Sequence, residues 1–540
     1  MKIRKVIVGF GLLLGVGIPL PALPQAKQDT TTQGTVAQGN QFDVRGFGAK
    51  GDGRTLDTQA IEKAIRAANA AGGGTVVFHP GVYVAGTFEL LSNVTLDLEV
   101  GAVIQGSGNM ADYGSITDFG FGRDYGVNYT GEGLKVGLIV AQNASNIGII
   151  GQGVIDGNSN AFFDFTKPHY SMDFDPQYTR QGEKFMDTVL ATGDGPAAVG
   201  PNGRAGTMII FSSCTNVLMR DITLRNAPNW TVHLANAQHV VVEGVHVLND
   251  VRVPNDDGFD CIGCRDAHFS DSYIRTGDDD FAIVGSEGVT ITNCSLVSNS
   301  SGIRLENTRG SVFSNLTIDA NRGIGIYDRG KGKTASVVFS NMVIDTHLLT
   351  GHWWGKGEPI YIAIGGAEGN AGVVRDVRFS NITGDAENGI VLYGAPGAWI
   401  RDISFEGVRF RFRVTRPEVN AEVGGNFDLR WTTDSLKTGI FKHDIPGLYA
   451  RYVDGLKLHD FEIQWAEAMP DYYSSALELE DFDNLSVDDF RGRQALVNSD
   501  NPAIALRRGK GVSIRNSTAD AGSSTFLSAS DVAGQLQYSE

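Results

Sequence analysis

The stretch VPNDDGFDCIGCRDAHFSDSYIRTGDDDFAIVG, residues 253–285, holds two groups of three aspartates beside two strand-like runs. The six aspartates are Asp256, Asp257, Asp260, Asp278, Asp279 and Asp280. A carboxylate among apolar neighbours costs free energy unless it is paired, hydrogen-bonded or protonated. If the two runs are adjacent rungs of a stacked β-structure, about 4.8 Å apart, the two groups stand side by side on one face. The fold of this stretch therefore decides whether the aspartates form a site.

Such a face suits acid–base chemistry. Carboxylates on neighbouring rungs can hold a water between a general acid and a general base, which stand roughly 6.5–9.5 Å apart in inverting glycosidases. The plainer alternative is structural, because Asp-Gly and Gly-Asp-Asp are ordinary turn sequences. We favour the catalytic interpretation because the rest of the chain predicts stacked rungs.

Strand-like units repeat along the chain at a spacing of about 20–28 residues. Each unit has an Asn or another polar turn, followed by alternating β-branched residues with one apolar side. Copies start at Asn93, Asn146, Asn216, His239, Ala267, Gly288, Ser311 and Ser336, and near Val374, Ala398, Val453, Asn484 and Gly511. A unit of this size cannot bury its own apolar face, so neighbours must stack. The sequence therefore predicts an all-β protein, a right-handed parallel β-helix, whereas a propeller needs repeats of about 40 residues or more.

A single amphipathic helix precedes the repeats. Asp57 is the expected N-cap, Ile61 and Ile65 lie on the apolar face, and Gly72–Gly74 ends the helix. We expect it to cap the β-helix, because a stack of strands exposes core and edges at its end. The β-helix should occupy residues 42–530 as one domain, followed by a C-terminal tail, 531–540. A shorter β-helix with a small C-terminal β-domain is the alternative.

The N-terminus is typical of an export signal. Lys2, Arg4 and Lys5 precede the apolar residues 6–20, and cleavage is expected after Ala26. Residues 1–26 are thus predicted to be a signal peptide and 27–41 a flexible leader. We expect a secreted or periplasmic protein, because no later stretch is long and apolar enough to cross a membrane.

The composition limits the classes of molecule that the protein is expected to bind. The net charge is −17, and no run rich in Lys and Arg follows the first residues. Nucleic acid and membrane are therefore unlikely partners, and we expect a monomer that acts on a polysaccharide or oligosaccharide. The four cysteines lie within strand-like runs, where small buried core residues are more typical than a disulfide or a zinc site.

Two inserts interrupt the repeats, at residues 158–206 and 346–360. Long loops on a rigid scaffold often carry function. The second insert contains Trp353 and Trp354. These rings either stack on sugar rings or pack onto the β-helix as covers.

Several motifs together resemble glycoside hydrolase family 28, the polygalacturonase and rhamnogalacturonase group of β-helix enzymes. The opening FDVRGFGAKGDGRTLDTQAIEKAI, residues 42–65, is similar to the family's usual entry sequence. More specific are NDDGFD, residues 255–260, and GDDD, residues 277–280, which resemble the family's NTDG(I/F)D and GDD motifs. The resemblance covers nearly all of residues 42–530.

The resemblance implies a role for each matching residue. Asp278 would be the general acid, Asp257 and Asp279 would activate the attacking water, and Asn255 would orient its neighbours. The reaction would proceed with inversion and without a metal or other cofactor. Adjacent carboxylates repel, so one of them holds a proton and its pKa rises.

The chain departs from the family at two positions. Ser300-Ser301-Gly302 stands where the family has Gly-His-Gly, and Gly325-Ile326-Tyr327 stands where it has Arg-Ile-Lys. Arg304, Arg322 or Arg329 can supply a displaced cation for a substrate carboxylate. The expected substrate-binding residues are Asn255, Asp280, Arg304, Tyr327, Trp353 and Trp354.

We therefore expect a glycoside hydrolase that cleaves α-linked bonds in a pectin-like galacturonan or rhamnogalacturonan. The missing His and Arg-Ile-Lys make a simple endo-polygalacturonase unlikely. One alternative is a polysaccharide lyase on the same fold, which would use calcium or a basic residue. Another is a non-catalytic, carbohydrate-binding β-helix.

Overall fold

The computed structural model describes residues 40–115, 136–169, 174–190, 193–365, 371–430, 439–523, 525–534 and 537–539. The expected signal peptide and nearly all of the expected leader lie outside these residues. Among the helices that are described, none is both long and apolar enough to cross a membrane.

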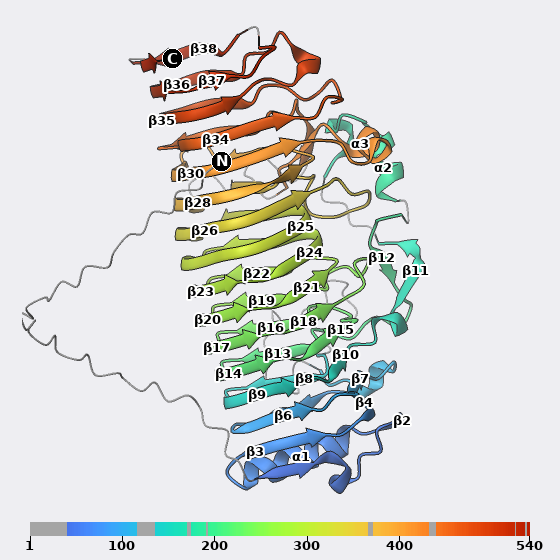
Figure 1. Cartoon of the computed structure of the whole chain (residues 1–540). Coiled ribbons are helices and arrows are strands. Elements are labelled where there is room, and N and C mark those ends of the chain that lie inside the picture. Colours follow the sequence, from blue (N-terminus) through green and yellow to red (C-terminus); the bar gives the residue numbers. More distant parts are fainter. Residues whose placement is uncertain are drawn as a thin grey trace, which may run out of the picture. The chain divides into compact units, whose positions relative to one another are not determined.

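The strands form three parallel ladders, and each turn of the chain adds one strand to every ladder (Figure 1). Neighbouring strands are successive turns: Val232 pairs with Phe259, and Phe259 with Phe281. The backbone groups of each turn thus find their partners in the turns before and after it. The predicted right-handed parallel β-helix is confirmed.

The aspartates lie in the first ladder or just before its strands. Its short strands are β5 (Phe88–Glu89), β8 (Ile139–Gln142), β13 (Ile209–Ser212), β16 (Val232–Ala235), β19 (Phe259–Ile262), β22 (Phe281–Val284), β27 (Ile360–Gly365), β29 (Ile390–Tyr393), β33 (Leu448–Asp454) and β38 (Leu527–Ala533). The second ladder contains β1 (Gln41–Asp43), β3 (Gly74–Phe78), β6 (Val94–Leu98), β9 (Ser145–Gly151), β14 (Thr215–Arg220), β17 (Gln238–Glu243), β20 (Arg265–Ser270), β23 (Glu287–Thr292) and β39 (Gln537–Ser539).

The third ladder contains β2 (Asp52–Leu56), β4 (Gly81–Ala85), β7 (Ala102–Gly106), β10 (Val154–Asp156), β15 (Thr223–Arg225), β18 (His246–Leu248), β21 (Tyr273–Thr276) and β37 (Thr518–Ala519). Longer strands bend from one ladder into the next. They are β24 (Ser295–Glu306), β25 (Arg309–Arg329), β26 (Lys333–Thr346), β28 (Val373–Ala386), β30 (Ile400–Phe412), β34 (Lys457–Trp465), β35 (Leu477–Gly492) and β36 (Ile504–Arg515). Strands β38 and β39 run into the residues expected to be a C-terminal tail.

The turns between ladders explain the asparagines of the repeat. Asn93, Asn146 and Asn216 each adopt a positive φ, which Asn tolerates better than most residues. Their side chains stack: the amide of Asn146 donates to Asn93 at 2.8 Å, and that of Asn216 donates to Asn146 at 2.9 Å. One polar residue therefore both makes the bend and links consecutive turns.

The predicted helix is confirmed as α1 (Thr58–Ala70), which buries Ile61 and Ile65 at the N-terminal end of the ladders. Asp57 is its N-cap residue, but its side chain makes no capping bond. Its carboxylate instead accepts from the backbone N–H groups of Lys50 and Gly51. Asp57 therefore occupies the expected N-cap position, but its side chain secures the preceding loop rather than the first turn of the helix.

In the described part of the chain, a third insert lies beside the first ladder together with the two predicted ones. The first holds β11 (Phe163–Pro168), α2 (Lys184–Val189) and β12 (Ala197–Val199); the third, residues 413–447, holds α3 (Pro417–Val423), β31 (Asn426–Asp428) and β32 (Ile440–Lys442). Together with the 346–360 insert they bury a second apolar cluster of Phe174, Phe185, Val189, Leu348, Val419, Val423 and Ile440. The inserts thus support one another.

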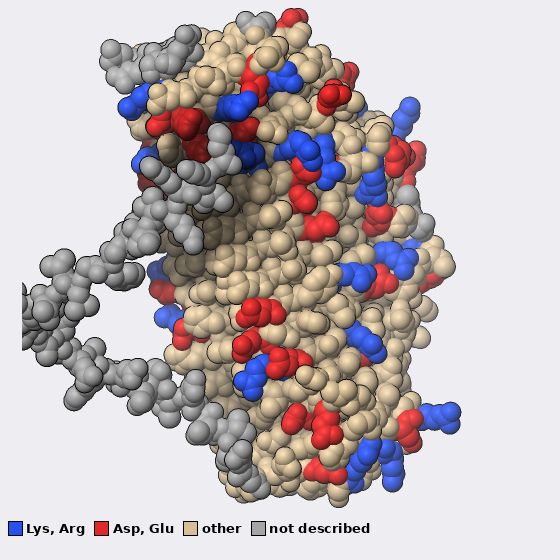
Figure 2. All heavy atoms as spheres, in the orientation of Figure 1, with Lys and Arg blue, Asp and Glu red and all other residues tan. Residues whose placement is uncertain are grey.

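Charged side chains of both signs are spread over the surface. On the face drawn in Figure 2, Lys and Arg side chains are interspersed with Asp and Glu, and neither sign covers it alone.

All four cysteines are buried and free of disulfides. The interpretation of the cysteines as core residues is confirmed.

A column of phenylalanines fills part of the core. Phe313, Phe339, Phe379 and Phe405 stack on successive turns, with ring centroids 4.9, 5.1 and 4.8 Å apart. Phe339 is fully buried between two of these rings. The core contacts therefore repeat with the period of the rungs.

We predict that Phe339→Ala lowers the free energy of unfolding by about 3–5 kcal/mol, because it leaves a cavity within the stack. Urea denaturation followed by circular dichroism measures the change. Val343→Ala on the same strand, with Val343 44% exposed, is the control and should change little. Equal losses for the two variants would contradict the stacked core.

Candidate active site

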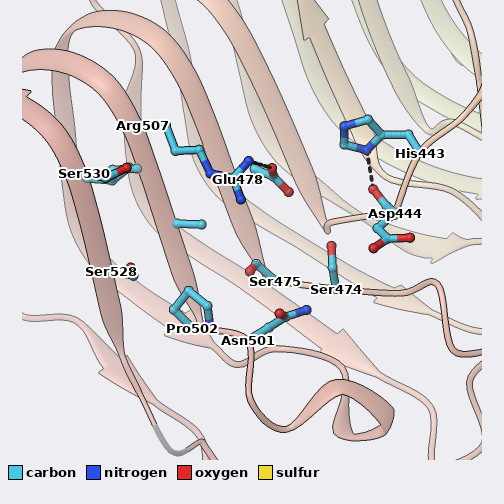
Figure 3. Close-up of a pocket in the computed structure, with 12 residues that line it drawn as sticks. His443, Asp444, Ser474, Ser475, Glu478, Asn501, Pro502, Arg507, Ser528 and Ser530 are labelled. Atoms are coloured by element: carbon cyan, nitrogen blue, oxygen red, sulfur yellow. Dashed lines mark hydrogen bonds and ion pairs between the residues drawn. The ribbon is translucent and has the colours of Figure 1, made fainter.

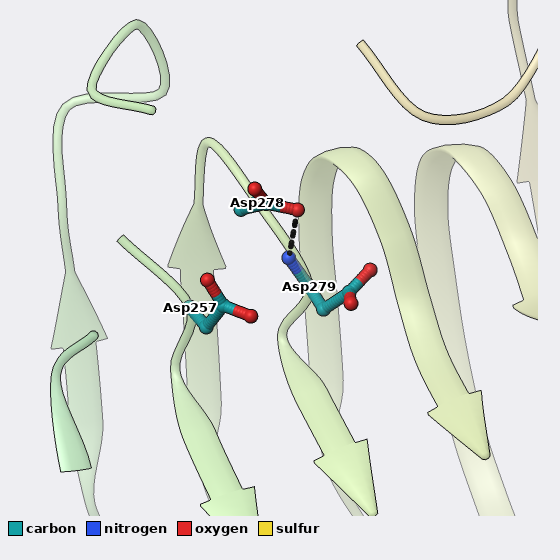
Figure 4. Close-up of side chains that lie close together, drawn as sticks. All are labelled: Asp257, Asp278 and Asp279. Atoms are coloured by element: carbon teal, nitrogen blue, oxygen red, sulfur yellow. Dashed lines mark hydrogen bonds between the residues drawn. The ribbon is translucent and has the colours of Figure 1, made fainter. Parts of the chain in front are cut away.

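The rung register brings the two groups of aspartates together. The backbone N–H of Gly258 donates to Asp279, and Phe259 pairs with Phe281, so Asp257 and Asp279 lie side by side on successive turns. Asp257, Asp278 and Asp279 each offer one carboxylate oxygen within 4.8 Å of the others (Figure 4). The predicted catalytic residues therefore form one cluster.

The cluster is buried. The exposed fractions of Asp257, Asp278 and Asp279 are 4%, 6% and 3%. Burial, together with the charge of Asp279, raises the pKa of Asp278 to about 7, against the opposing effect of Arg304. Burial and the nearby Asp260 and Asp278 carboxylates raise the pKa of Asp257 as well. The group therefore holds at least one proton near neutral pH, which is what a general acid requires.

The separation of these oxygens is shorter than the roughly 6.5–9.5 Å typical of inverting glycosidases. A water accepts or donates hydrogen bonds at about 2.7–2.8 Å, so two oxygens less than 4.8 Å apart can both hold the same water. Asp257 and Asp279 each also have one buried carboxylate oxygen without a hydrogen-bond partner.

Asp256 and Asp280 support the turn beneath the cluster. One Asp256 oxygen accepts the backbone N–H groups of Gly277 and Asp278 at 2.7 and 3.1 Å. The Thr276 hydroxyl lies 2.6 Å from the Asp278 carbonyl and 2.9 Å from Asp280 Oδ1. A hydroxyl has one proton and can donate to only one of them. Both contacts are satisfied if Asp280 is protonated, and burial does raise its pKa.

Asn255 links the cluster to the first insert. Its amide donates to Asp278 Oδ2 at 3.4 Å, while its own oxygen accepts from Arg204 at 3.0 Å. Arg204 also donates to the carbonyls of Pro228 and Pro254 at 3.1 and 2.5 Å. Sequence reasoning missed Arg204, which is fully buried and 51 residues from Asn255. Its position in an insert beside glycines gave no signal of a partner.

Of the three candidate cations, Arg304 is the one beside the aspartates. Its guanidinium lies 3.7 Å from Asp279 and 3.3 Å from Glu306. Arg329 also pairs with Glu306, at 3.1 Å, farther along the strand. Arg322 is fully buried and is bound by Glu358 at 3.2 Å. Arg304 therefore supplies the charge that opposes the like charges of the cluster.

The residues that replace the family's motifs are adjacent in the structure. Ser301 follows Asp279 in the row of turns, and Arg322 follows Ser301. A Cβ at Gly325 would lie 2.3 Å from the Tyr327 phenol oxygen, so the ring folds back over this glycine. The phenol accepts from Arg322 at 2.5 Å. A buried Tyr–Arg pair thus takes the place expected for a substrate-binding cation.

Several expected substrate-binding side chains are buried. Asp280, Tyr327 and Trp353 are at most 2% exposed. Trp353 donates to the carbonyl of Asp194 at 2.6 Å, and the Arg430 guanidinium lies 4.1 Å from the centre of the Trp354 ring. Trp353 thus has the covering role that was one of the two alternatives, whereas Trp354 is half-buried and stays a predicted substrate contact. Asn255 and Arg304 remain predicted substrate contacts.

The same three carboxylates are close enough to hold a cation. Among the described residues, Asp257, Asp278 and Asp279 make up such a group of acidic side chains. Hard divalent cations prefer oxygen ligands of this kind. Chelator sensitivity is therefore part of any test of the reaction.

Residues 41–327, more than half of the chain, match the family model described as rhamnogalacturonase A/epimerase, pectate lyase-like. The chain belongs to this family. The matched residues include all three clustered aspartates, and they end at Tyr327.

The curated relatives that this chain matches are distant in sequence. The exo-poly-alpha-D-galacturonosidase of Dickeya chrysanthemi is 29% identical over 269 residues, and the Vitis vinifera protein named probable polygalacturonase is 28% identical over 244 residues. These matches cover 46% and 44% of this chain and 43% of each relative, less than half its length. The family 28 exopolygalacturonase of Yersinia enterocolitica has the same fold, with a TM-score of 0.58 and 18% identity over 83% of this chain and 78% of its own.

We predict that Asp280→Asn stabilises the protein more at pH 8 than at pH 5. The raised pKa keeps Asp280 protonated in the fold after the unfolded chain has ionised, so wild-type stability falls as pH rises through this window. The effect is about 1.4 kcal/mol for each pKa unit. Denaturation curves at the two pH values measure it.

The exposed Asp471→Asn is the matched control. It should change stability equally at both pH values. An Asp280→Asn effect that is also independent of pH would mean that Asp280 does not change protonation on unfolding.

Proposed function

We propose that the protein is a glycoside hydrolase that cleaves α-glycosidic bonds in a pectin-like polysaccharide, with inversion at the anomeric carbon. The observation that carries this proposal is the cluster of Asp257, Asp278 and Asp279. Membership of the rhamnogalacturonase A/epimerase family and the names of the two galacturonan-hydrolysing relatives support the substrate class.

In this mechanism Asp278 is the general acid. Its pKa of about 7 keeps it protonated in mildly acidic solution, and it gives this proton to the oxygen of the leaving sugar. Asp279, stabilised as a carboxylate by Arg304, takes a proton from the water that it shares with Asp257. The water oxygen bonds to the anomeric carbon as the glycosidic bond breaks, and the electron pair leaves with the departing sugar.

The substrate differs from plain polygalacturonate in this proposal. The family's His is replaced at Ser300–Ser301, and its Arg-Ile-Lys is replaced at Gly325–Tyr327. Arg304 offers the guanidinium closest to the cluster, and a substrate carboxylate can bind there in place of Glu306. A rhamnogalacturonan, a substituted pectin or another acidic polysaccharide fits this arrangement. We further propose that the protein is exported and acts as a monomer.

We predict that Asp278→Asn lowers kcat about 10²–10⁴-fold, because asparagine cannot supply the proton to the leaving oxygen. A reducing-end assay over a panel of pectic and other acidic polysaccharides measures the rate. Asp271→Asn, at an exposed turn of the same coil, is the control. Wild-type turnover that persists in Asp278→Asn would contradict the assignment.

The same assay separates the alternatives. A lyase would form unsaturated products that absorb in the near ultraviolet, and chelator would abolish activity if it used calcium. A binding protein would retain polysaccharide without new reducing ends. Proton NMR of the first product shows whether the anomeric configuration is inverted.

We predict that kcat/KM falls as pH rises through about 7, because Asp278 then loses the proton that it must donate. A pH–rate profile from pH 4 to 9 measures this. Arg304→Met should move the alkaline limb to higher pH, since Arg304 lowers the pKa of Asp278. A limb that stays in place would mean that another group sets it.

A further inference from the structure

A cavity of ≈ 300 Å³ lies near the C-terminal end of the first ladder, outside the residues matched by the family model. Strands β35, β36 and β38 form its base, and the turns before β35 and β36 form one wall. Figure 3 shows His443 and Asp444 on one side of it and Ser528 and Ser530 on the opposite side. Most of the lining residues are polar, and the apolar ones are Pro502, Ala505 and Leu506.

The cavity lies at the same position of the first ladder as the aspartate cluster, several rungs farther along the chain. Strand pairings connect Asp260 to Glu478 through seven successive rungs of the first ladder, on the same outward row. Ser475 precedes Glu478 by three residues, just as Asp257 precedes Asp260. At about 4.8 Å per rung, the two places are roughly 34 Å apart on one face. The rungs between them are covered, since Tyr361 and Val391 on this row are fully buried, so a polymer reaches both places by passing over the inserts.

Ser474 indicates that a ligand belongs in the cavity. Its side chain is 4% exposed and lines the space, and its hydroxyl oxygen has no hydrogen-bond partner. A buried polar atom without a partner is costly, and native proteins seldom leave one unexplained. A bound hydroxyl group would provide the missing partner.

The charges of the lining disfavour an anionic ligand. Arg507 is the basic lining residue besides His443, and Glu478 and Glu480 already bind it at 3.3 and 3.0 Å. Glu478 and Asp444 place two carboxylates around the same space. A uronate carboxylate would add a third negative charge beside these two acids. Sugar hydroxyls, in contrast, both donate to carboxylates and accept from Ser474 and Asn501.

We infer that this cavity binds an uncharged sugar ring of the same polysaccharide that the aspartate cluster acts on. The inference rests on the proposed function for the identity of the polymer, but not for the binding itself. It makes the substrate a mixed polysaccharide, in which uncharged sugars accompany the uronates.

The test measures binding in the Asp278→Asn background, so that the polymer is not cut. Isothermal titration with a pectic polysaccharide bearing uncharged sugars, with polygalacturonate, and with a galacturonate trisaccharide supplies the affinities. Ser528→Trp fills the cavity from its exposed rim, and Ser474→Ala removes the unpartnered hydroxyl. Ser145→Trp, at an exposed start of strand β9 in the second ladder, is the control.

We expect Ser528→Trp to weaken binding of the mixed polysaccharide about tenfold, a loss of one well-placed ring. Ser474→Ala should weaken it about fivefold, as for one hydrogen bond. The trisaccharide and the control variant should bind as before. Equal affinities for Ser528→Trp and Ser145→Trp would overturn the inference, as would an equal loss with polygalacturonate, since the ring would then be a uronate.

The outcomes also separate this inference from the proposed function. If no substrate yields reducing ends but the cavity variants still weaken binding, hydrolysis fails and the binding site stands. If hydrolysis is established and the cavity variants leave both binding and KM unchanged, the binding site alone fails.

Discussion

The hydrogen-bonded spacing of parallel rungs is the constraint on which this structure depends. Each backbone turn pairs with the turns on either side, so residues at the same position of successive turns become neighbours. This places Asp257 beside Asp279, Asp279 beside Ser301, and Ser301 beside Arg322. No side-chain interaction has to assemble the row, because the ladder already fixes it.

The same constraint creates an electrostatic problem. Six aspartates gather within two rungs, and burial raises the pKa of every one of them. Three contacts offset the repulsion between these carboxylates. Asp256 accepts backbone N–H groups, Asp280 is hydrogen-bonded to the Thr276 hydroxyl, and the Arg304 guanidinium lies beside Asp279. Holding charge in a preorganised, water-poor site is costly for stability but favourable for proton transfer.

The inserts hold the surroundings of the cluster in place. Arg204 from the first insert binds Asn255, and Arg322 is bound by Glu358 from the second and Asp428 from the third. Arg430 binds Asp428 at 2.8 Å and also covers Trp354. Removing one member of such a buried network leaves the others unpaired, so the network favours one arrangement of the inserts.

Much of the architecture was evident in the sequence. The repeat of polar turns and alternating strands predicted the β-helix, and the spacing of Asp257 and Asp278 predicted neighbouring rungs. These features are local: period-two alternation, asparagine at positive φ, and one coil of chain between related residues. Their physics does not require knowledge of distant parts of the chain.

The contacts between distant segments could only be found in the tertiary structure. Arg204 reaches Asn255, Trp353 is buried against the first insert, and the third insert completes the second apolar cluster. Each depends on how loops of irregular length fold back on the ladder, which no periodic pattern encodes. The sequence by itself therefore determined the scaffold and the row of aspartates. The tertiary structure decided how deeply the aspartates are buried, which arginine faces them, and where a second polar cavity opens on the first ladder.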